Sequence, residues 1–211
     1  MFTGIITEIG KVKNLRKEKA SSIFGIHAPQ TTKGKKIGQS IAVNGVCVTI
    51  TKLSQKDFEF EAIEETLKKT NLNDLKIGEK VNLEPALKLN QSLDGYLVQG
   101  HIDSKGKVLI LDIKKEKSTL KIEFPEDISQ YLAFKGSITI NGVNLTISEL
   151  QTDFFKIDLT NYTLENTNLK NLKKGDIVNL ETDIIAKYLE RLLNQKEKET
   201  KFQFLKDRNL I

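Results

Sequence analysis

Short stretches of alternating apolar and polar residues, separated by turn residues, run through most of the chain. Residues 40–43 alternate, Asn44-Gly45 follows directly, and residues 46–51 are rich in β-branched side chains. Alternation with a period of two predicts half-buried strands, and Asn-Gly between two such runs is the strongest short signal for a β-hairpin. Similar runs predict further strands at residues 4–12, 23–28, 58–63 and 80–84. Many short strands within about 90 residues predict a small closed β-barrel, which leaves no strand edge exposed.

The whole pattern occurs twice. The stretch SIAVNGVCVTI at residues 40–50 returns as SITINGVNLTI at residues 137–147, which is 97 residues later. The same offset relates Thr70-Asn71-Leu72 to residues 167–169 and Val81-Asn82-Leu83-Glu84 to residues 178–181. Upstream the offset slips by one, so that Gly4-Ile5-Ile6 corresponds to Gly100-His101-Ile102. A period of this length is a whole domain, so the sequence predicts a duplicated domain and not a solenoid.

Helical patterns are confined to short connections and the C-terminal part. Residues 66–72 and 163–169 are predicted as short helical connections, and residues 87–96 as the linker between the halves. An apolar stripe at helical spacing then predicts an amphipathic helix. Its members are Ile184, Ile185, Tyr188, Leu189, Leu192 and Leu193. The stripe fits either oligomerisation or packing on the chain's own barrel, and the pattern does not assign the residues after Lys196.

Composition excludes several classes of protein. The chain has 211 residues, enough for one large domain or two small ones, and no apolar run approaches the ~20 residues of a membrane span. The N-terminus has no signal-peptide pattern, and a single cysteine suits a reducing compartment, so we expect a cytoplasmic protein. One Cys and two His provide no metal-ligand cluster. The net charge of +5 is scattered and mostly due to Lys, which indicates a solvated surface and no nucleic-acid partner.

The duplication itself suggests chemistry. Two similar domains offer two similar ligand sites, which suits a reaction between two copies of one molecule, because holding them together replaces a bimolecular encounter. Two identical molecules that react differently need unequal surroundings, so the informative positions are those where the halves disagree. These positions are Cys47 against Asn144, His101 against Ile5, Ala62 against Leu159, and Glu84-Pro85-Ala86 against Glu181-Thr182-Asp183.

Taken together, these motifs are those of a known family. The segments MFTGII, SIAVNGVCVTI, LVQGHID, KGSITINGVNLTI and NLETD, in this order over nearly the whole chain, resemble the riboflavin synthase family of the alpha-chain type. The resemblance implies an all-β fold of two tandem six-stranded antiparallel Greek-key barrels plus a C-terminal α-helix. We therefore expect barrels at residues 1–90 and 97–185, and a helix and tail for trimerisation at residues 186–211.

The resemblance also implies a reaction. Family members convert two molecules of 6,7-dimethyl-8-ribityllumazine into riboflavin and 5-amino-6-ribitylamino-uracil by transfer of a four-carbon unit, with no metal and no cofactor. The enzyme is a homotrimer, and two substrate molecules share a site between the N-terminal barrel of one subunit and the C-terminal barrel of a neighbour. Association with lumazine synthase is left open by the sequence.

Site residues carry over where this sequence matches the family. The expected catalytic residues are His101, Ser40, Cys47 and Asp183. The expected substrate-binding residues are Gly4, Ile5, Ile6, Cys47, Val48, Thr49, Glu61, Ala62, Ile63, Glu64, Glu65, Thr66, Gly100, His101, Ile102, Lys135, Asn144, Leu145, Thr146, Thr160, Asn161, Tyr162, Thr163, Leu164 and Glu165.

The residue types fit the implied chemistry. The 7-methyl group of the substrate is an acidic C–H because the ring delocalises the resulting charge, and His101, with Ser40, is the expected base. Cys47, or a water beside it, is expected to assist nucleophilic addition to the acceptor ring. Structural alternatives stay open: Cys47 as a small buried apolar residue, Lys135 as surface charge, and Asp183 as the N-cap of the terminal helix.

Two residues depart from the family's usual sequence, and three other classes of protein compete with this assignment. Asn144 stands where the family commonly has Ser, and Asn161 where it commonly has Pro. The main rival is a non-catalytic paralogue like the lumazine and yellow fluorescent proteins, which hold one chromophore. The presence of Ser40, Cys47, His101 and Asp183 favours an enzyme. A flavin-dependent reductase would need a Gly-rich G-x-G-x-x-G turn, which does not occur in the sequence, and a pure scaffold would leave the paired sites unexplained.

Overall fold

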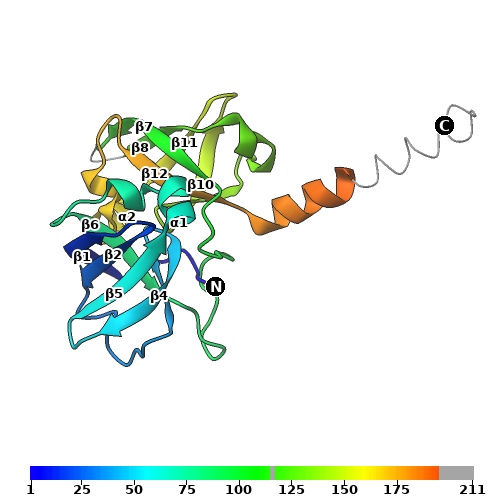
Figure 1. Cartoon of the computed structure of the whole chain (residues 1–211). Helices are drawn as coiled ribbons and strands as arrows, with labels where there is room; N and C mark the ends of the chain where they lie inside the picture. The colour runs from blue at the N-terminus through cyan, green and yellow to red at the C-terminus, as the bar shows by residue number, and fades with distance from the viewer. Residues whose placement is uncertain (115–116, 195–211) are drawn as a thin grey trace, which may run out of the picture.

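The two halves of the chain form two closed six-stranded antiparallel barrels (Figure 1). The structure is a computed structural model, and it describes residues 1–114 and 117–194. Around the first barrel the strands follow the order β1-β2-β5-β4-β3-β6. Their bounds are β1 (Glu8–Lys17), β2 (Ser21–His27), β3 (Ser40–Val43), β4 (Val46–Leu53), β5 (Asp57–Ile63) and β6 (Lys80–Pro85). Helix α1 (Glu64–Lys69) and the 3₁₀ turn η1 (Asn71–Asp74) connect β5 to β6.

The second barrel repeats this connectivity. Its strands are β7 (Ser104–Asp112), β8 (Ser118–Glu123), β9 (Ser137–Ile140), β10 (Val143–Leu150), β11 (Phe154–Leu159) and β12 (Ile177–Thr182). The connections are η2 (Glu126–Tyr131), helix α2 (Asn161–Asn166) and η3 (Asn168–Asn171). The cyclic order of strands, β7-β8-β11-β10-β9-β12, matches the first barrel strand for strand. The prediction of a duplicated all-β barrel is therefore confirmed.

Each barrel encloses its own apolar core. In β4 the side chains of Val46, Val48 and Ile50 are buried while Thr49 between them is exposed, as alternation along a strand requires. Aromatic rings fill the centre of the first core, where Phe24 and Phe60 stack with ring centroids 5.0 Å apart. Fully burying a side chain of this size contributes roughly 2–3 kcal/mol. Because the inward positions are filled, a ligand has access only to the outer faces of the barrels.

The two Asn-Gly hairpins lie back to back between the barrels. Asn44 and Gly45 have φ values of 46° and 80°, and Asn141 and Gly142 repeat them at 46° and 81°. Positive φ at both central positions is the requirement of the tight hairpin turn that Asn-Gly favours. A Cβ atom added at Gly45 would lie 2.7 Å from the backbone nitrogen of Gly142. The glycines therefore permit both the turns and their close approach.

A buried network of asparagine side chains joins the same two turns to the rest of the interface. Asn44 Oδ1 accepts hydrogen bonds from the backbone N–H of Asn82 at 2.9 Å and from Asn168 Nδ2 at 3.0 Å. The second half repeats this arrangement, with Asn141 Oδ1 accepting from Asn179 N–H at 2.9 Å and from Asn71 Nδ2 at 3.0 Å. The repeated Asn-Gly motif thus has a structural role on the pseudo-two-fold axis.

The segments that precede the two barrels each cross to the other barrel. We call residues 4–6 and 100–102 the crossing segments. The backbone N–H of Asn144 in β10 donates to the carbonyl of Gly4 at 2.9 Å, and that of Cys47 in β4 donates to the carbonyl of Gly100 at 2.9 Å. Ile6 packs on the core of the second barrel and Ile102 on that of the first. The strand predicted at residues 4–12 consequently begins only at Glu8, because Gly4 bonds to β10 and Ile6 packs on the core of the second barrel.

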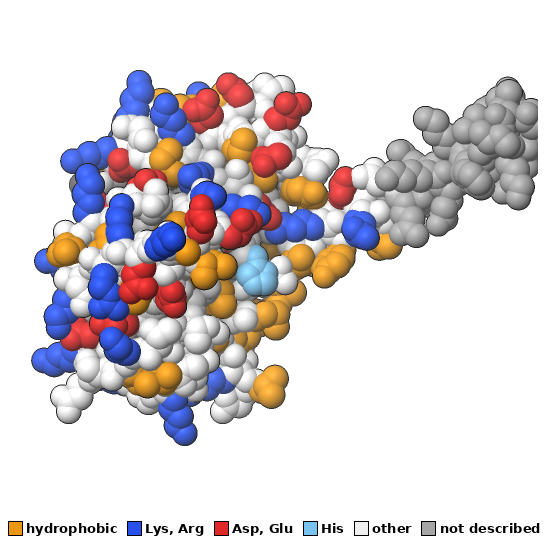
Figure 2. All heavy atoms as spheres, viewed as in Figure 1, with side chains coloured by type: hydrophobic (Ala, Val, Ile, Leu, Met, Phe, Trp, Pro, Cys, Tyr) orange, Lys and Arg blue, Asp and Glu red, His pale blue; other side chains and the backbone are white. Residues whose placement is uncertain are grey.

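The C-terminal helix extends away from both barrels (Figure 1). Its described part covers residues 184–194, and the apolar members Ile185, Tyr188, Leu189, Leu192 and Leu193 are between 51% and 64% exposed. Apolar side chains also gather along this helix in Figure 2, whereas charges of both signs are mixed over the barrels. The stripe is therefore not packed on the chain's own barrel. Residues 195–211 of the helix and tail predicted at residues 186–211 lie outside the described residues. Within the described ranges, no helix has both the length and the apolar character that a membrane crossing needs.

Candidate active site

The first candidate half-site lies on the outer face of β3 and β4. Ser40 pairs with Thr49, and Cys47 pairs with Ala42, so these side chains alternate with those of the barrel core. Ala42 is buried there in a small cluster with Phe2 and Val98, against which Cys47 packs. The crossing segment of the second repeat closes over this face. A Cβ atom added at Gly100 would lie 2.6 Å from Cys47 Cβ, so only glycine permits this approach. His101 follows at once and is exposed to solvent.

The second candidate half-site repeats this geometry with different side chains. Asn144 and Thr146 lie on the outer face of β10, and a Cβ atom added at Gly4 would lie 2.5 Å from Asn144 Cβ. Ile5 follows Gly4 and is 45% exposed. Where the first half-site has Cys47 and His101, the second therefore has Asn144 and Ile5. The two differences between the repeats, Cys47 against Asn144 and His101 against Ile5, therefore occur together in the half-sites. Each half-site contains residues from both repeats.

The predicted lining residues at the ends of β5 and β11 divide into outward and inward positions. Glu61, Ile63, Glu64 and Glu65 are exposed, and Thr66 is half-buried, whereas the Ala62 side chain belongs to the first core. In the second half, Thr160 Oγ1 caps α2 by accepting a hydrogen bond from Thr163 N–H at 3.2 Å. Asn161, Tyr162 and Glu165 are exposed, while Leu164 belongs to the second core.

Three predicted lining residues thus turn their side chains into the barrels. They are Val48, Ala62 and Leu164, and Leu145 packs partly against the second core as well. For Val48, Ala62 and Leu145 the physical reason is strand alternation, because residues on either side of an outward-facing position must point inward. Leu164 instead lies in helix α2, where it is the buried residue and packs on the second core. At these positions only backbone groups remain for a ligand at the outer face.

Lys135 occupies a backbone conformation that non-glycine residues rarely adopt. Its φ is 64°, and the corresponding position in the first half is Gly38, with φ 87°. Both residues donate their backbone N–H to a strand carbonyl, Lys135 to Ile147 at 3.0 Å and Gly38 to Ile50 at 2.9 Å. A lysine held in the left-handed region where the other repeat has glycine stores strain, which is typical of functional positions. Its Nζ lies 5.2 Å from the centroid of the Phe134 ring.

Asp183 lies at the base of the C-terminal helix. Its Oδ1 accepts a hydrogen bond from the backbone N–H of Ile185 at 2.8 Å, so it caps the helix. Its other oxygen accepts from the hydroxyl of Tyr96, a residue that the sequence reading missed. Burial, followed by the bond to Asp183, raises the pKa of Tyr96 to about 12. Because Tyr96 N–H donates to the carbonyl of Thr3 at 2.8 Å, this pair links the helix to the segment that carries Gly4.

Two buried glutamates were also missed as site residues. Glu84 at the end of β6 and Glu181 at the end of β12 are 4% and 3% exposed, and each carboxylate accepts backbone N–H groups from the first residue of a crossing segment and from the residue before it. Burial raises the pKa of both, against the hydrogen bonds that favour the charged form, and brings that of Glu181 to about 7. The repeated Val-Asn-Leu-Glu stretch marked both positions without indicating this role.

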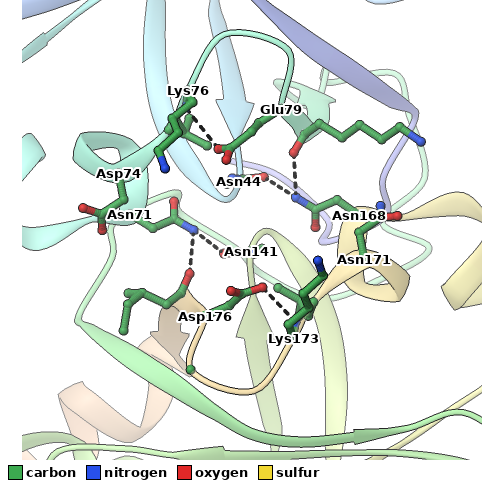
Figure 3. Close-up of a pocket in the computed structure, with 15 residues that line it drawn as sticks. Asn44, Asn71, Asp74, Lys76, Glu79, Asn141, Asn168, Asn171, Lys173 and Asp176 are labelled. Atoms are coloured by element: carbon green, nitrogen blue, oxygen red, sulfur yellow. Dashed lines mark hydrogen bonds between the residues drawn. The ribbon is translucent and has the colours of Figure 1, made fainter.

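A separate hollow of about 610 Å³ opens on the pseudo-two-fold axis (Figure 3). It is lined by the asparagine network and by turns from both halves, and none of the predicted site residues borders it. Two of its carboxylates, Glu79 and Asp176, accept hydrogen bonds from the backbone N–H of Lys76 and Lys173 at 3.1 and 2.8 Å. The hollow is thus the seam between the barrels. Within residues 1–114 and 117–194, no three His, Cys, Asp or Glu side chains converge as a metal site would require.

Comparison with known proteins identifies the class to which this architecture belongs. The family model described as "Lumazine binding domain" matches residues 3–86 and again residues 99–183. Crystal structures of LumP complexed with riboflavin and with 6,7-dimethyl-8-(1'-D-ribityl) lumazine are similar, with TM-scores of 0.81 and 0.79 at 28% and 27% identity. Each comparison covers 86% of this chain and 99% of LumP. The fold and the paired outer faces are thus those of a protein with duplicated lumazine-binding domains.

Curated relatives narrow the family further. Riboflavin synthase from Actinobacillus pleuropneumoniae is 38% identical over 196 residues, which cover 93% of this chain and 91% of the relative. Riboflavin synthase from Mycobacterium bovis is 40% identical over 197 residues, which cover 92% and 98%. The chain belongs to the riboflavin synthase family.

Proposed function

We propose that the chain is a riboflavin synthase, a transferase that converts two 6,7-dimethyl-8-ribityllumazine molecules into riboflavin and 5-amino-6-ribitylamino-uracil. The observation that carries this proposal is the pair of unequal half-sites, each built from both repeats. Equivalent outer faces suit two copies of one ligand. The exchange of Cys47 and His101 for Asn144 and Ile5 gives the two copies different chemical surroundings.

Within this reaction the first half-site supplies the titratable groups. The acidic 7-methyl proton of one lumazine passes to a base, and His101 is the exposed imidazole beside the outer face of β4. Cys47, which is partly exposed on the same face, assists addition to the ring, and Ser40 provides a hydroxyl one strand away. The second half-site binds through Asn144, Thr146 and the strained Lys135. Asn144, where the family commonly has Ser, retains an amide N–H donor for the ligand, whereas its Oδ1 is buried without a hydrogen-bond partner.

A non-catalytic chromophore-binding protein is the less favoured function. LumP, which was crystallised with lumazine, riboflavin and flavin mononucleotide, is 27–28% identical to this chain. The riboflavin synthases from the two organisms named above are 38% and 40% identical. Together with the presence of His101, Cys47 and Ser40, this difference favours turnover over storage of a ligand.

We propose that the active assembly is a homotrimer formed through the C-terminal helix. The helix exposes a continuous apolar stripe over residues 185–193, which the barrels of the same chain leave uncovered. Fully burying each large apolar side chain of the stripe contributes about 1.5–3 kcal/mol, so a partner helix stabilises the stripe strongly. In such a trimer the first barrel of one subunit faces the second barrel of a neighbour. A cytoplasmic location and an association with lumazine synthase belong to the same proposal.

The direct test of this function is turnover. The purified protein, without added metal or cofactor, is mixed with 6,7-dimethyl-8-ribityllumazine, and both pteridine species are quantified by chromatography. One riboflavin formed for every two lumazines consumed supports the synthase. Tight binding without riboflavin would support the chromophore-binding alternative, and Asn144→Ser is then the first variant to assay for restored turnover.

A further inference from the structure

Each crossing segment is fixed by a buried carboxylate that binds two consecutive backbone N–H groups. Glu181 Oε1 accepts from Gln99 N–H at 2.6 Å and Oε2 accepts from Gly100 N–H at 2.9 Å. Glu84 Oε1 accepts from Thr3 N–H at 2.6 Å and Oε2 accepts from Gly4 N–H at 2.9 Å. The Thr3 hydroxyl adds a third hydrogen bond to Glu84, at 2.8 Å. We call these two arrangements the carboxylate clamps.

The carboxylate clamps end one residue before the side chains that distinguish the half-sites. Gly100 is held by Glu181 through its N–H, and its carbonyl accepts from Cys47 N–H at 2.9 Å. His101 is the next residue. In the first repeat Gly4 is held by Glu84 and by Asn144 N–H in the same way, and Ile5 is the next residue. Both the N–H and the carbonyl of each glycine are therefore held by hydrogen bonds, which sets the direction in which the chain continues to the following residue.

Packing alone does not account for these groups. A carboxylate that is 97% or 96% buried is costly to desolvate, and an apolar side chain would fill the same space without that cost. Two oxygens that accept two consecutive N–H groups fix both the position and the orientation of the backbone, which an apolar contact does not do. The clamps thus fix the position and the orientation of the backbone beside each half-site.

We propose that Glu181 is a positioning residue for His101, and that Glu84 is the corresponding positioning residue for Ile5. This inference rests on the proposed function. The two clamps share the same chemistry but serve different half-sites, so their loss has different kinetic effects. Misplacing His101 slows proton transfer, because small displacements of a catalytic group reduce its contribution by roughly ten- to hundredfold. Misplacing Ile5 changes the surface on which a lumazine lies, and so weakens its binding.

The experiment compares Glu181→Gln with Glu84→Gln in the full chain. Glutamine has nearly the same shape but only one acceptor oxygen, so one N–H group in each clamp loses its partner. Hydrogen exchange followed by mass spectrometry reports the amides of residues 99–100 and 3–4, and steady-state kinetics with lumazine report kcat and KM. We expect Glu181→Gln to accelerate exchange at residues 99–100 only and to lower kcat roughly tenfold or more, with KM changed less than about threefold. We expect Glu84→Gln to accelerate exchange at residues 3–4 and to raise KM more than it lowers kcat.

The possible outcomes distinguish a failure of this inference from a failure of the proposed function. Equal kcat and KM changes in the two variants, or an unchanged kcat in Glu181→Gln, would overturn the positioning roles. If the unmodified protein forms no riboflavin, the proposed function fails, and amide exchange that stays unchanged at residues 99–100 in Glu181→Gln and at residues 3–4 in Glu84→Gln would overturn the clamps as well. Glu181→Asp, which keeps both oxygens on a shorter side chain, covers the case in which Glu181→Gln does not fold. We expect it to give an intermediate kcat, and a kcat equal to that of the unmodified protein would contradict the proposal.

Discussion

At the scale of single residues, the half-sites are distinguished by a small number of substitutions on equivalent backbones. Cys47 and Asn144 occupy the same position of β4 and β10, and each donates its backbone N–H to the carbonyl of a glycine in a crossing segment. The backbone constraint is identical, so the side chains are free to differ. A histidine beside one face and an isoleucine beside the other then provide a base for one ligand and an apolar surface for its partner.

Replacing His101 tests the assignment of the base. We expect His101→Gln to lower kcat about a hundredfold or more, which is the usual contribution of a positioned acid or base, while ligand affinity changes little. His27→Gln is the matched control. That histidine lies on the outside of β2 and pairs with Asp57 at 2.8 Å, so kcat is expected to remain unchanged. A similar loss of kcat in both variants would exclude a specific role for His101.

The raised pKa of Glu181 predicts how the stability of the fold depends on pH. Because burial raises the pKa of this carboxyl from its ordinary 4.5 to about 7, the folded chain binds the proton more tightly than the unfolded chain does. The stabilisation is therefore full below pH 4.5 and is lost as pH rises to 7, and it amounts to about 3 kcal/mol. Hydrogen bonds from Gln99 and Gly100 and the charge of Lys187 oppose this effect, and the charge of Asp103 adds to it.

Denaturant unfolding at pH 5 and pH 8 measures this contribution. We expect the free energy of unfolding to fall between the two values by less in Glu181→Gln than in the unmodified chain. Glu123→Gln, at an exposed position on β8, should leave the fall unchanged. An identical fall in Glu181→Gln and the unmodified chain would show that this carboxyl does not titrate in that range.

At the scale of elements, the hairpins and the C-terminal helix have different tasks. The Asn-Gly turns hold the barrels together at the pseudo-two-fold axis, while the helix exposes its apolar side chains to a partner. Both features could be read from local sequence, since Asn-Gly and helical spacing are short-range signals. The contacts of the crossing segments could not be read from local sequence. Residues 4–6 look like the beginning of a strand, and no local pattern tells which of two similar barrels such a segment will contact.

Gly45→Ala tests the contact between the turns. A methyl group there would lie 2.7 Å from Gly142 nitrogen, in a residue whose φ is 80°. Gly34→Ala is the control, because Gly34 also has a positive φ of 67° but no atom lies within 4 Å of the added group. We expect Gly34→Ala to cost about 1 kcal/mol of unfolding free energy and Gly45→Ala at least about 1 kcal/mol more, measured by chemical denaturation. Equal costs would mean that the tight contact is not maintained.

A matched pair of substitutions tests assembly through the C-terminal helix. Leu192→Lys places a charge in the apolar stripe, whereas Asn194→Lys places the same charge on the opposite side of the helix. We expect the first variant to sediment as a monomer and to lose turnover, and the second to retain both the assembly and the activity. A trimeric Leu192→Lys protein would contradict assembly through this stripe.

At the scale of the whole molecule, duplication places two similar faces on one chain and lets them diverge. The alignment of the halves and their alternation predicted the barrels, and the family resemblance supplied the candidate residues. Strand alternation then turned Val48 and Ala62 inward, and the packing of helix α2 did the same for Leu164, away from the faces they were expected to line. Asp183 was open between two roles, and its bonds to Ile185 and Tyr96 give it at least the role of a helix cap. The bond to Tyr96 connects residues that are 87 positions apart in sequence, so pattern alone did not reveal it.

The most direct test of the two-half-site account is the number of ligands that each chain binds. A lumazine analogue without the 7-methyl group cannot give up the proton that starts the reaction, so it measures binding without turnover. Isothermal titration of the assembled protein should give two analogues per chain with two different dissociation constants, because the faces around Cys47 and Asn144 are equivalent in shape and unequal in chemistry. A single analogue per chain, or two with one shared dissociation constant, would contradict the account.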